Sequence, residues 1–105
     1  MRAELVVLSV DRSAHGAARA GEGRRGLPEA FLMAGARQVL ASLWHVDDEA
    51  TRALMVKFYE LWNPKEGKGA GAAAALSAAK DFVRKQERWK HPRYWAGWVL
   101  YGLPD

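Results

Sequence analysis

Two short apolar runs separated by a helix-like segment constrain the fold more than any other feature of the sequence. The first run, Glu4–Val10, is rich in β-branched residues and ends at polar ones, which is typical of a strand buried on both faces. The second run, Gln38–Trp44, also predicts a strand. Between them, Leu27–Gly35 predicts a short helix, because Pro28 suits a first helical turn and Gly35 suits a C-terminal stop. A strand, a helix and a strand in this order predict a right-handed parallel βαβ unit.

The rest of the chain adds two helices and a last strand. Asp47 and Asp48 open a helix that ends before Pro64, and either acid can cap it. Its apolar stripe consists of Ala50, Leu54, Phe58, Leu61 and Trp62. A second helix is predicted over Ala72–Glu87, with an inner face made of Ala72, Ala75, Leu76, Ala79, Phe82, Val83 and Gln86. Ala96–Tyr101 predicts the last strand. The order β-α-β-α-α-β predicts an α/β fold with a small, mostly parallel sheet flanked by helices, in one domain over residues 1–105.

Composition excludes several classes of function. None of the 105 residues is cysteine, which excludes a disulfide framework, a zinc–thiolate site and a cysteine nucleophile within this sequence. Hydrophobic residues make up 50% and charged residues 27%, as in a folded domain. No apolar stretch approaches the roughly 18 residues of a membrane helix, and the opening residues are too few and too acidic for a signal peptide. We therefore expect a cytoplasmic protein with no membrane partner and no cofactor.

Two polar clusters early in the chain resemble catalytic or binding motifs but lack the required geometry. Gly21–Gly26 matches G-x-G-x-x-G, and Asp47 lies at the distance of the ribose-binding acid. A dinucleotide site needs its first glycine directly after the strand, so a loop over Asp11–Gly26 is the better interpretation. The second cluster lies within one short stretch and cannot converge as a catalytic triad. It consists of Ser9, Asp11, Ser13 and His15.

Two further constellations favour ordinary structural roles. The three histidines, His15, His45 and His91, lack the helical spacing to a second ligand that zinc sites use, so no metal site is predicted. A basic stretch over residues 80–93 interleaves cations with aromatic side chains, as in single-strand binders. Its members are Lys80, Arg84, Lys85, Arg88, Lys90 and Arg93, with Trp89 and Trp95 among or beside them. Because Asp81 and Glu87 lie in the same stretch, a solvated helix face is favoured over a nucleic-acid interface.

Six segments in one order resemble the C-terminal half of a CHAT domain, a caspase-like domain often found beside TPR repeats. The resemblance covers nearly the whole chain. The segments are Leu5–Ser9, the glycines Gly21–Gly23 with Gly26 and Leu27, Phe31–Arg37, Ser42–Asp48, Phe58 with Tyr59, and His91–Gly97. It implies a caspase-like fold and, in active members, a cysteine peptidase with a Cys–His dyad. The family stretch Leu-Ser-Ala-Cys corresponds to Leu8–Asp11, so Asp11 stands at the nucleophile position.

The departure from the family pattern favours an inactive domain. The family histidine belongs to a segment upstream of this sequence, and His15 does not match it. Because a carboxylate cannot replace a thiolate in acyl transfer, we expect a pseudo-peptidase. An alternative is a fragment or variant of a cysteine peptidase that needs an N-terminal half. A relic of the substrate pocket would consist of Ser9, Asp11, Trp44 and Asp47, although a simple capping role for Asp47 is favoured.

The expected role is binding to other proteins. Without an upstream neighbour, the Leu5–Val10 strand is expected to leave an open sheet edge. The resemblance places the last strand, Trp98–Tyr101, at the other edge, where caspase-like domains can dimerise. Candidate interface residues are Leu5, Val7, Trp98 and Leu100. The expected partners are a second copy of the chain, a separate N-terminal CHAT half, or a TPR-containing protein, with weak nucleic-acid binding as a second alternative. The chain itself is expected to be of bacterial type.

Overall fold

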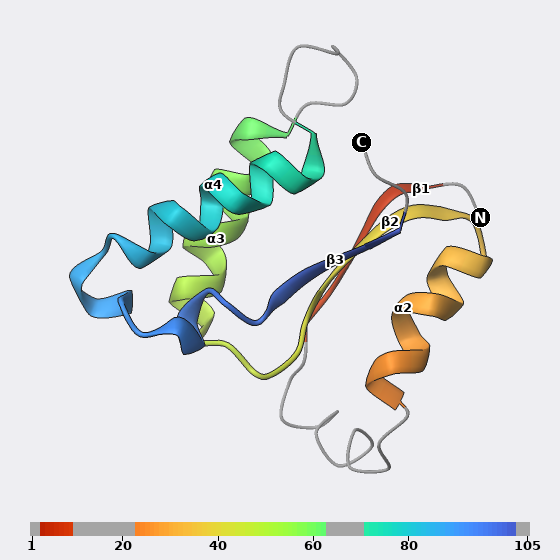
Figure 1. Cartoon of the computed structure of the whole chain (residues 1–105), viewed down its shortest axis with the longest axis horizontal. Helices are drawn as coiled ribbons and strands as arrows, with labels where there is room; N and C mark the ends of the chain where they lie inside the picture. Colours follow the sequence, from red (N-terminus) through yellow and green to blue (C-terminus); the bar gives the residue numbers. More distant parts are fainter. Residues whose placement is uncertain (1–2, 10–22, 63–70, 103–105) are drawn as a thin grey trace. The chain divides into compact units, whose positions relative to one another are not determined.

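The computed structural model describes residues 3–9, 23–62 and 71–102, which divide into two compact units. Unit 1 comprises Met1–His45 and Trp98–Leu103, and unit 2 comprises Val46–Gly97 and Pro104–Asp105. Figure 1 shows the elements of both units in chain order. Each unit is described by itself, and the prediction of a single subdomain over 1–105 stays a prediction.

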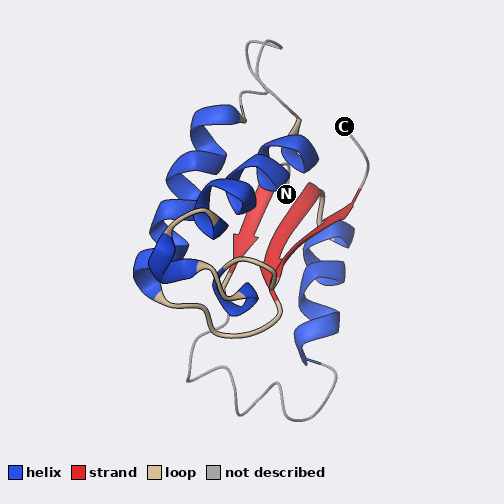
Figure 2. Ribbon diagram, turned by 60° about the vertical axis from the view of Figure 1, so that its left-hand side comes forward, coloured by secondary structure: helices blue, strands red, loops and turns tan. Residues whose placement is uncertain are grey.

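Unit 1 is a three-stranded sheet with one helix on it. Its strands are β1 (Ala3–Leu8), β2 (Ala36–Ser42) and β3 (Trp98–Gly102), in the order β1-β2-β3, and the helix is α2 (Gly23–Met33). The mixed α/β architecture expected of a caspase-like half-domain is thereby confirmed. Figure 2 shows the three strands side by side with α2 beside them.

The sheet is mixed rather than mostly parallel. β1 pairs with β2 in parallel, with Val7 opposite Leu40, as the βαβ prediction requires. β3 pairs with β2 antiparallel, with Leu100 opposite Leu40 and Trp98 opposite Ser42. The reason lies in the connection. Two successive helices, α3 (Asp48–Leu61) and α4 (Ala72–Arg84), connect β2 to β3, and the first residue of β3, Trp98, pairs with the last residue of β2, Ser42.

One face of the sheet forms an apolar core with α2. Val39 and Ala41 of β2 are buried, and Val6, Leu8 and Tyr101 from the neighbouring strands pack against them. The helix contributes Phe31 and Leu32 to the same cluster. These strand residues share a face because side chains alternate along a strand. At about 25 cal/mol per Å² of apolar surface removed from water, such burial is the main force that holds a helix on a sheet.

Unit 2 contains two packed helices and two short 3-10 turns. The helices are α3 (Asp48–Leu61) and α4 (Ala72–Arg84), and the turns are Glu87–Trp89 and Pro92–Tyr94. The α3 side chains buried in the structure are Ala50, Leu54 and Phe58, all members of the predicted stripe. Those of α4 are Ala72, Ala75, Leu76, Ala79 and Val83, again as predicted. Alanine at three of these five positions lets neighbouring backbone approach α4 closely.

Several boundaries differ from the sequence-based expectations. Helix α2 begins at Gly23, so Gly23–Gly26 belongs to the helix rather than to a loop, and Pro28 lies inside it. Arg24 and Arg25 are good helix formers and favour this earlier start, whereas Pro28 lacks the N–H that would bond to the preceding turn. Helix α4 ends at Arg84 rather than Glu87, because Gln86 has extended backbone. Phe82, expected in the core, is 40% exposed.

The strand ends also differ. β1 ends at Leu8, β2 covers Ala36–Ser42 and β3 begins at Trp98. Leu43 and Trp44, predicted within the second strand, are exposed beyond it. Among the described helices, none combines the length and apolarity needed to cross a bilayer.

Candidate functional site

The carboxyl ends of β1 and β2 lie at the same edge of the sheet. Leu8 pairs with Ala41 near the ends of these two parallel strands. Ser9 follows β1 and is exposed. The side chain of Ser42, the last residue of β2, is buried. This is the end of a parallel pair at which α/β proteins place ligands.

The other members of the first polar cluster lie outside the described residues. These are Ser13, His15 and Asp11, the residue predicted to stand at the family nucleophile position. Of the predicted pocket relic, the structure therefore places Ser9, Trp44 and Asp47. Trp44 is 37% exposed in the segment after β2.

Asp47 caps helix α3. Its Oδ2 accepts a hydrogen bond from the Ala50 backbone N–H at 3.1 Å, and its own backbone is extended, with φ −48° and ψ 135°. Asp48 and Glu49 follow in the first turn, where negative charge complements the helix dipole. The capping interpretation of Asp47 is confirmed by this bond.

The four candidate interface residues share one face of the sheet, opposite the α2 core. Val7 and Leu100 both lie opposite Leu40 in the register, and Trp98 lies opposite Ser42. Leu5, Val7 and Leu100 are half-buried, whereas Trp98 is 1% exposed. An interface through β1 or β3 would therefore use the backbone of these edge strands more than the Trp98 side chain.

The described residues contain no cluster of three or more acidic or histidine side chains that could hold a metal ion. His15 lies outside the described residues. His91 has a local structural role, because its Nδ1 accepts a hydrogen bond from the Arg93 backbone N–H at 3.1 Å. This bond caps the turn Pro92–Tyr94.

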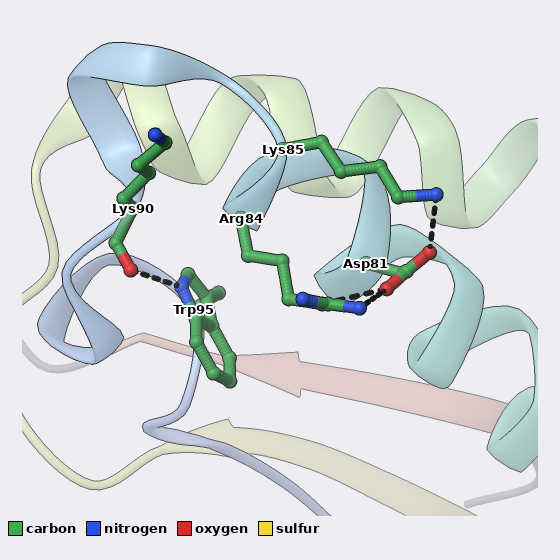
Figure 3. A network of polar contacts seen from close by, with 5 residues as sticks. All are labelled: Asp81, Arg84, Lys85, Lys90 and Trp95. Atoms are coloured by element: carbon green, nitrogen blue, oxygen red, sulfur yellow. Dashed lines mark hydrogen bonds and ion pairs between the residues drawn. The ribbon is translucent and has the colours of Figure 1, made fainter.

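The two acids of the basic stretch over residues 80–93 form ion pairs with three of its six cations. Asp81 accepts from Lys85 Nζ at 2.9 Å and from Arg84 Nε at 2.6 Å (Figure 3). Glu87 pairs with Lys90 Nζ at 2.9 Å. The Trp95 indole donates to the Lys90 carbonyl at 3.3 Å, so this ring is held in place (Figure 3). These contacts are typical of a solvated helix face, which supports that interpretation over a phosphate-binding surface.

One carboxylate and one amine of this stretch have altered pKa values. Hydrogen bonds from Lys85 and Arg84 lower the pKa of Asp81 below its ordinary value. Partial burial lowers the pKa of Lys80, because desolvation disfavours the charged amine.

A surface groove between α3 and the C-terminal part of α4 was not predicted from the sequence. It has a volume of about 610 Å³ and is lined by Arg52, Val56 and Lys57 of α3, Phe82 of α4, and Arg88 and Trp89 among others. Helical spacing predicts Phe82 in the core and does not include Val56 in the apolar stripe. The structure shows that both side chains are exposed, and this exposure identifies the groove.

Comparisons with known proteins agree with the sequence resemblance. The family model of the CHAT domain matches residues 1–103. Tetratricopeptide repeat protein 28 of Mus musculus is 39% identical over 100 residues, which cover 94% of this chain and 4% of that protein. The Homo sapiens protein of the same name is 38% identical over 100 residues, with the same coverage of 94% and 4%. This chain thus spans a small fraction of the curated relatives it matches. No solved structure matches.

Proposed function

This chain belongs to the CHAT domain family, and we propose that it is a catalytically inactive member that acts by binding other proteins, in the first place a second copy of itself. The observation that carries the proposal is the edge position of β1 in the sheet of the described residues. A separate N-terminal CHAT half and a tetratricopeptide-repeat protein are the alternative partners. The cytoplasmic location stays a prediction, as does the bacterial type.

The chemistry of the nucleophile position supports inactivity. The sequence contains no cysteine, and the motif resemblance described above implies that Asp11 stands where the family has its thiol. Amide cleavage by a cysteine peptidase needs a thiolate, activated by a nearby base, that forms an acyl-enzyme. A carboxylate attacks an amide carbonyl poorly, and the mixed anhydride it would form reverts to the starting amide.

The arrangement of the sheet supports binding through β1. In the order β1-β2-β3, β1 pairs with β2 alone among the described strands. An edge strand of this kind can add a strand from another chain. Leu5, Val6 and Val7 are apolar and only half-buried, so an added strand would cover more of this surface. A two-fold copy would meet the same edge and produce a closed dimer.

The relatives support a setting among helical repeats. The two curated proteins named above are called tetratricopeptide repeat proteins, and this chain matches a short part of each. A repeat protein presents extended surfaces for other proteins. A binding role for the matching segment fits that setting.

Light scattering during gel filtration tests self-association directly. We expect a mass twice that of the chain, with a monomer fraction that grows on dilution. Hydrogen exchange then locates the contact without any mutation. We expect protection of β1 amides to rise with protein concentration, while the amides of α3 and α4 stay unchanged. A monomer at every concentration would contradict the self-binding proposal.

Labelling with a thiol-reactive peptide trap tests the lack of activity. The wild-type chain should not react, and an Asp11→Cys variant should react at the rate of an ordinary free thiol. A rate far above that of glutathione would show that a base near position 11 activates the new thiol. That result would favour the alternative that this chain is a fragment or variant of a cysteine peptidase.

A further inference from the structure

The groove of unit 2 described above has an apolar floor that is open to solvent. Val56 of α3 is 56% exposed and Phe82 of α4 is 40% exposed. They come from different helices, yet both line the same space of about 610 Å³. Large apolar side chains that gather in one groove with charged neighbours are typical of a protein-binding surface.

The charges around this floor leave an excess of positive charge. Glu49 pairs with Arg88 at 3.1 Å, and Glu60 pairs with Lys57 at 3.3 Å. Lys57 Nζ also lies 5.2 Å from the centre of the Phe82 ring. Arg52, one turn after Glu49, lines the groove and has no acidic partner among the described residues. An incoming carboxylate would therefore be attracted to Arg52.

We propose that this groove binds an amphipathic α-helix of a partner protein, whose apolar face covers Val56 and Phe82 and whose acidic flank meets Arg52. None of the residues that line this groove belongs to β1. The groove therefore gives the chain a second, independent contact.

The shape of the groove favours a helix over an extended peptide. Its α3 wall is formed by Glu49, Arg52, Ala53, Val56, Lys57 and Glu60. This stripe covers about three turns, or roughly 16 Å at 1.5 Å per residue. An extended peptide would need partners for its backbone groups, and two of the basic side chains here are already paired. A helix satisfies its own backbone and presents side chains at matching intervals.

Titration of the full chain with two designed peptides tests the proposal. The first peptide is an amphipathic helix of leucine and alanine with glutamate along its flanks, and the second has lysine in place of every glutamate. We expect the glutamate peptide to bind at least about tenfold more tightly, measured by fluorescence anisotropy. In ¹⁵N spectra, the signals that move should be the Trp89 indole N–H and the amides of Val56 and Phe82. Failure of the glutamate peptide to bind, or equal binding of both peptides, would overturn the proposal.

Charge reversal at Arg52 gives the sharper test. Arg52→Glu should weaken binding of the glutamate peptide and strengthen binding of the lysine peptide, because it reverses the charge at this position. Arg52 is exposed, so its replacement leaves the core intact. Val56→Ser should weaken binding of the glutamate peptide. Met33→Ser, at a 90% exposed position on α2, should leave the affinity for this peptide unchanged. If Arg52→Glu leaves both affinities unchanged, or instead dissociates a dimer of the chain, the helix-docking proposal is wrong. Protection of β1 amides is measured in the same variants, so the two proposals fail or succeed separately.

Discussion

The carboxylate of Asp47 and the backbone N–H of Ala50 are joined by a 3.1 Å hydrogen bond that begins helix α3. Replacing Asp47 by Ala removes this acceptor and should lower the free energy of unfolding by about 1 kcal/mol. Asp47→Asn keeps an oxygen acceptor at the same place and should cost less. Urea unfolding followed by circular dichroism measures both.

Asp48→Ala is the matched control for the cap. Asp48 lies in the first turn of α3, where its charge favours the helix dipole, but Asp47 provides the capping bond. Its loss should cost about 0.3 kcal/mol, mostly at low salt. Equal losses for Asp47→Ala and Asp48→Ala would show that the cap contributes nothing beyond charge.

Gly102 should not tolerate a side chain. Its φ is +116°, and a Cβ there would collide with the Arg37 carbonyl oxygen and lie 3.0 Å from the Gln38 Cα. Because these are backbone atoms of the adjacent strand β2, they cannot move aside cheaply. Gly102→Ala should therefore destabilise the protein by about 2–3 kcal/mol.

Gly35→Ala tests the backbone strain that Gly35 shares with Gly102. Gly35 has the same φ of 116° and follows helix α2. The strain of this conformation should cost about 1 kcal/mol. Thermal unfolding of the two variants compares them, and a larger loss at Gly35 would contradict the account given for Gly102.

Phe58 should contribute far more to stability than its neighbour Tyr59. Phe58 is fully buried in α3 and its ring stacks on Trp62 at 5.7 Å, whereas Tyr59 is half exposed. Phe58→Ala should cost about 3–5 kcal/mol because it removes apolar contacts and leaves a cavity. Tyr59→Ala should cost about 1 kcal/mol, mainly through the lost ring contact with Phe58. Similar losses would mean that the α3 stripe does not form the core.

The ion pairs of Asp81 should make stability depend on pH in acid. Hydrogen bonds from Lys85 and Arg84 lower its pKa in the folded protein below the ordinary 3.8. The stabilisation is therefore present at neutral pH and is lost as the pH falls through the folded-state pKa. NMR titration of the Asp81 carboxyl measures this directly. Lys85→Ala should raise the pKa towards 3.8, and an unchanged value would show that this lysine has no influence.

The alternation of strands and helices could be predicted because each element has a period of its own. The β1 run, the α3 stripe from Ala50 to Phe58 and the capping acid Asp47 all follow from local rules. The direction of β3 could not be predicted in this way, since it depends on how two successive helices return the chain to the end of β2.

The groove escaped prediction for a different reason. Phe82 falls on the apolar face of α4 by spacing, yet α3 leaves its ring open to solvent. Val56 lies outside the buried stripe of α3, and a single exposed valine does not by itself predict a binding surface. Their meeting depends on the packing of two helices, which local periodicity does not encode.

The pairing of Ser42 with Trp98 has a consequence for the order in which the chain folds. All of unit 2 up to Gly97 is inserted between these two neighbours. A growing chain therefore makes β1, α2 and β2 first, but β2 has no second neighbour until Trp98–Gly102 is synthesised. The contacts within each helix are local and can form sooner, so we expect the helices to precede the completed sheet. During that interval the sheet consists of β1 and β2 alone, and the edge of β2 that later pairs with β3 can pair with another strand.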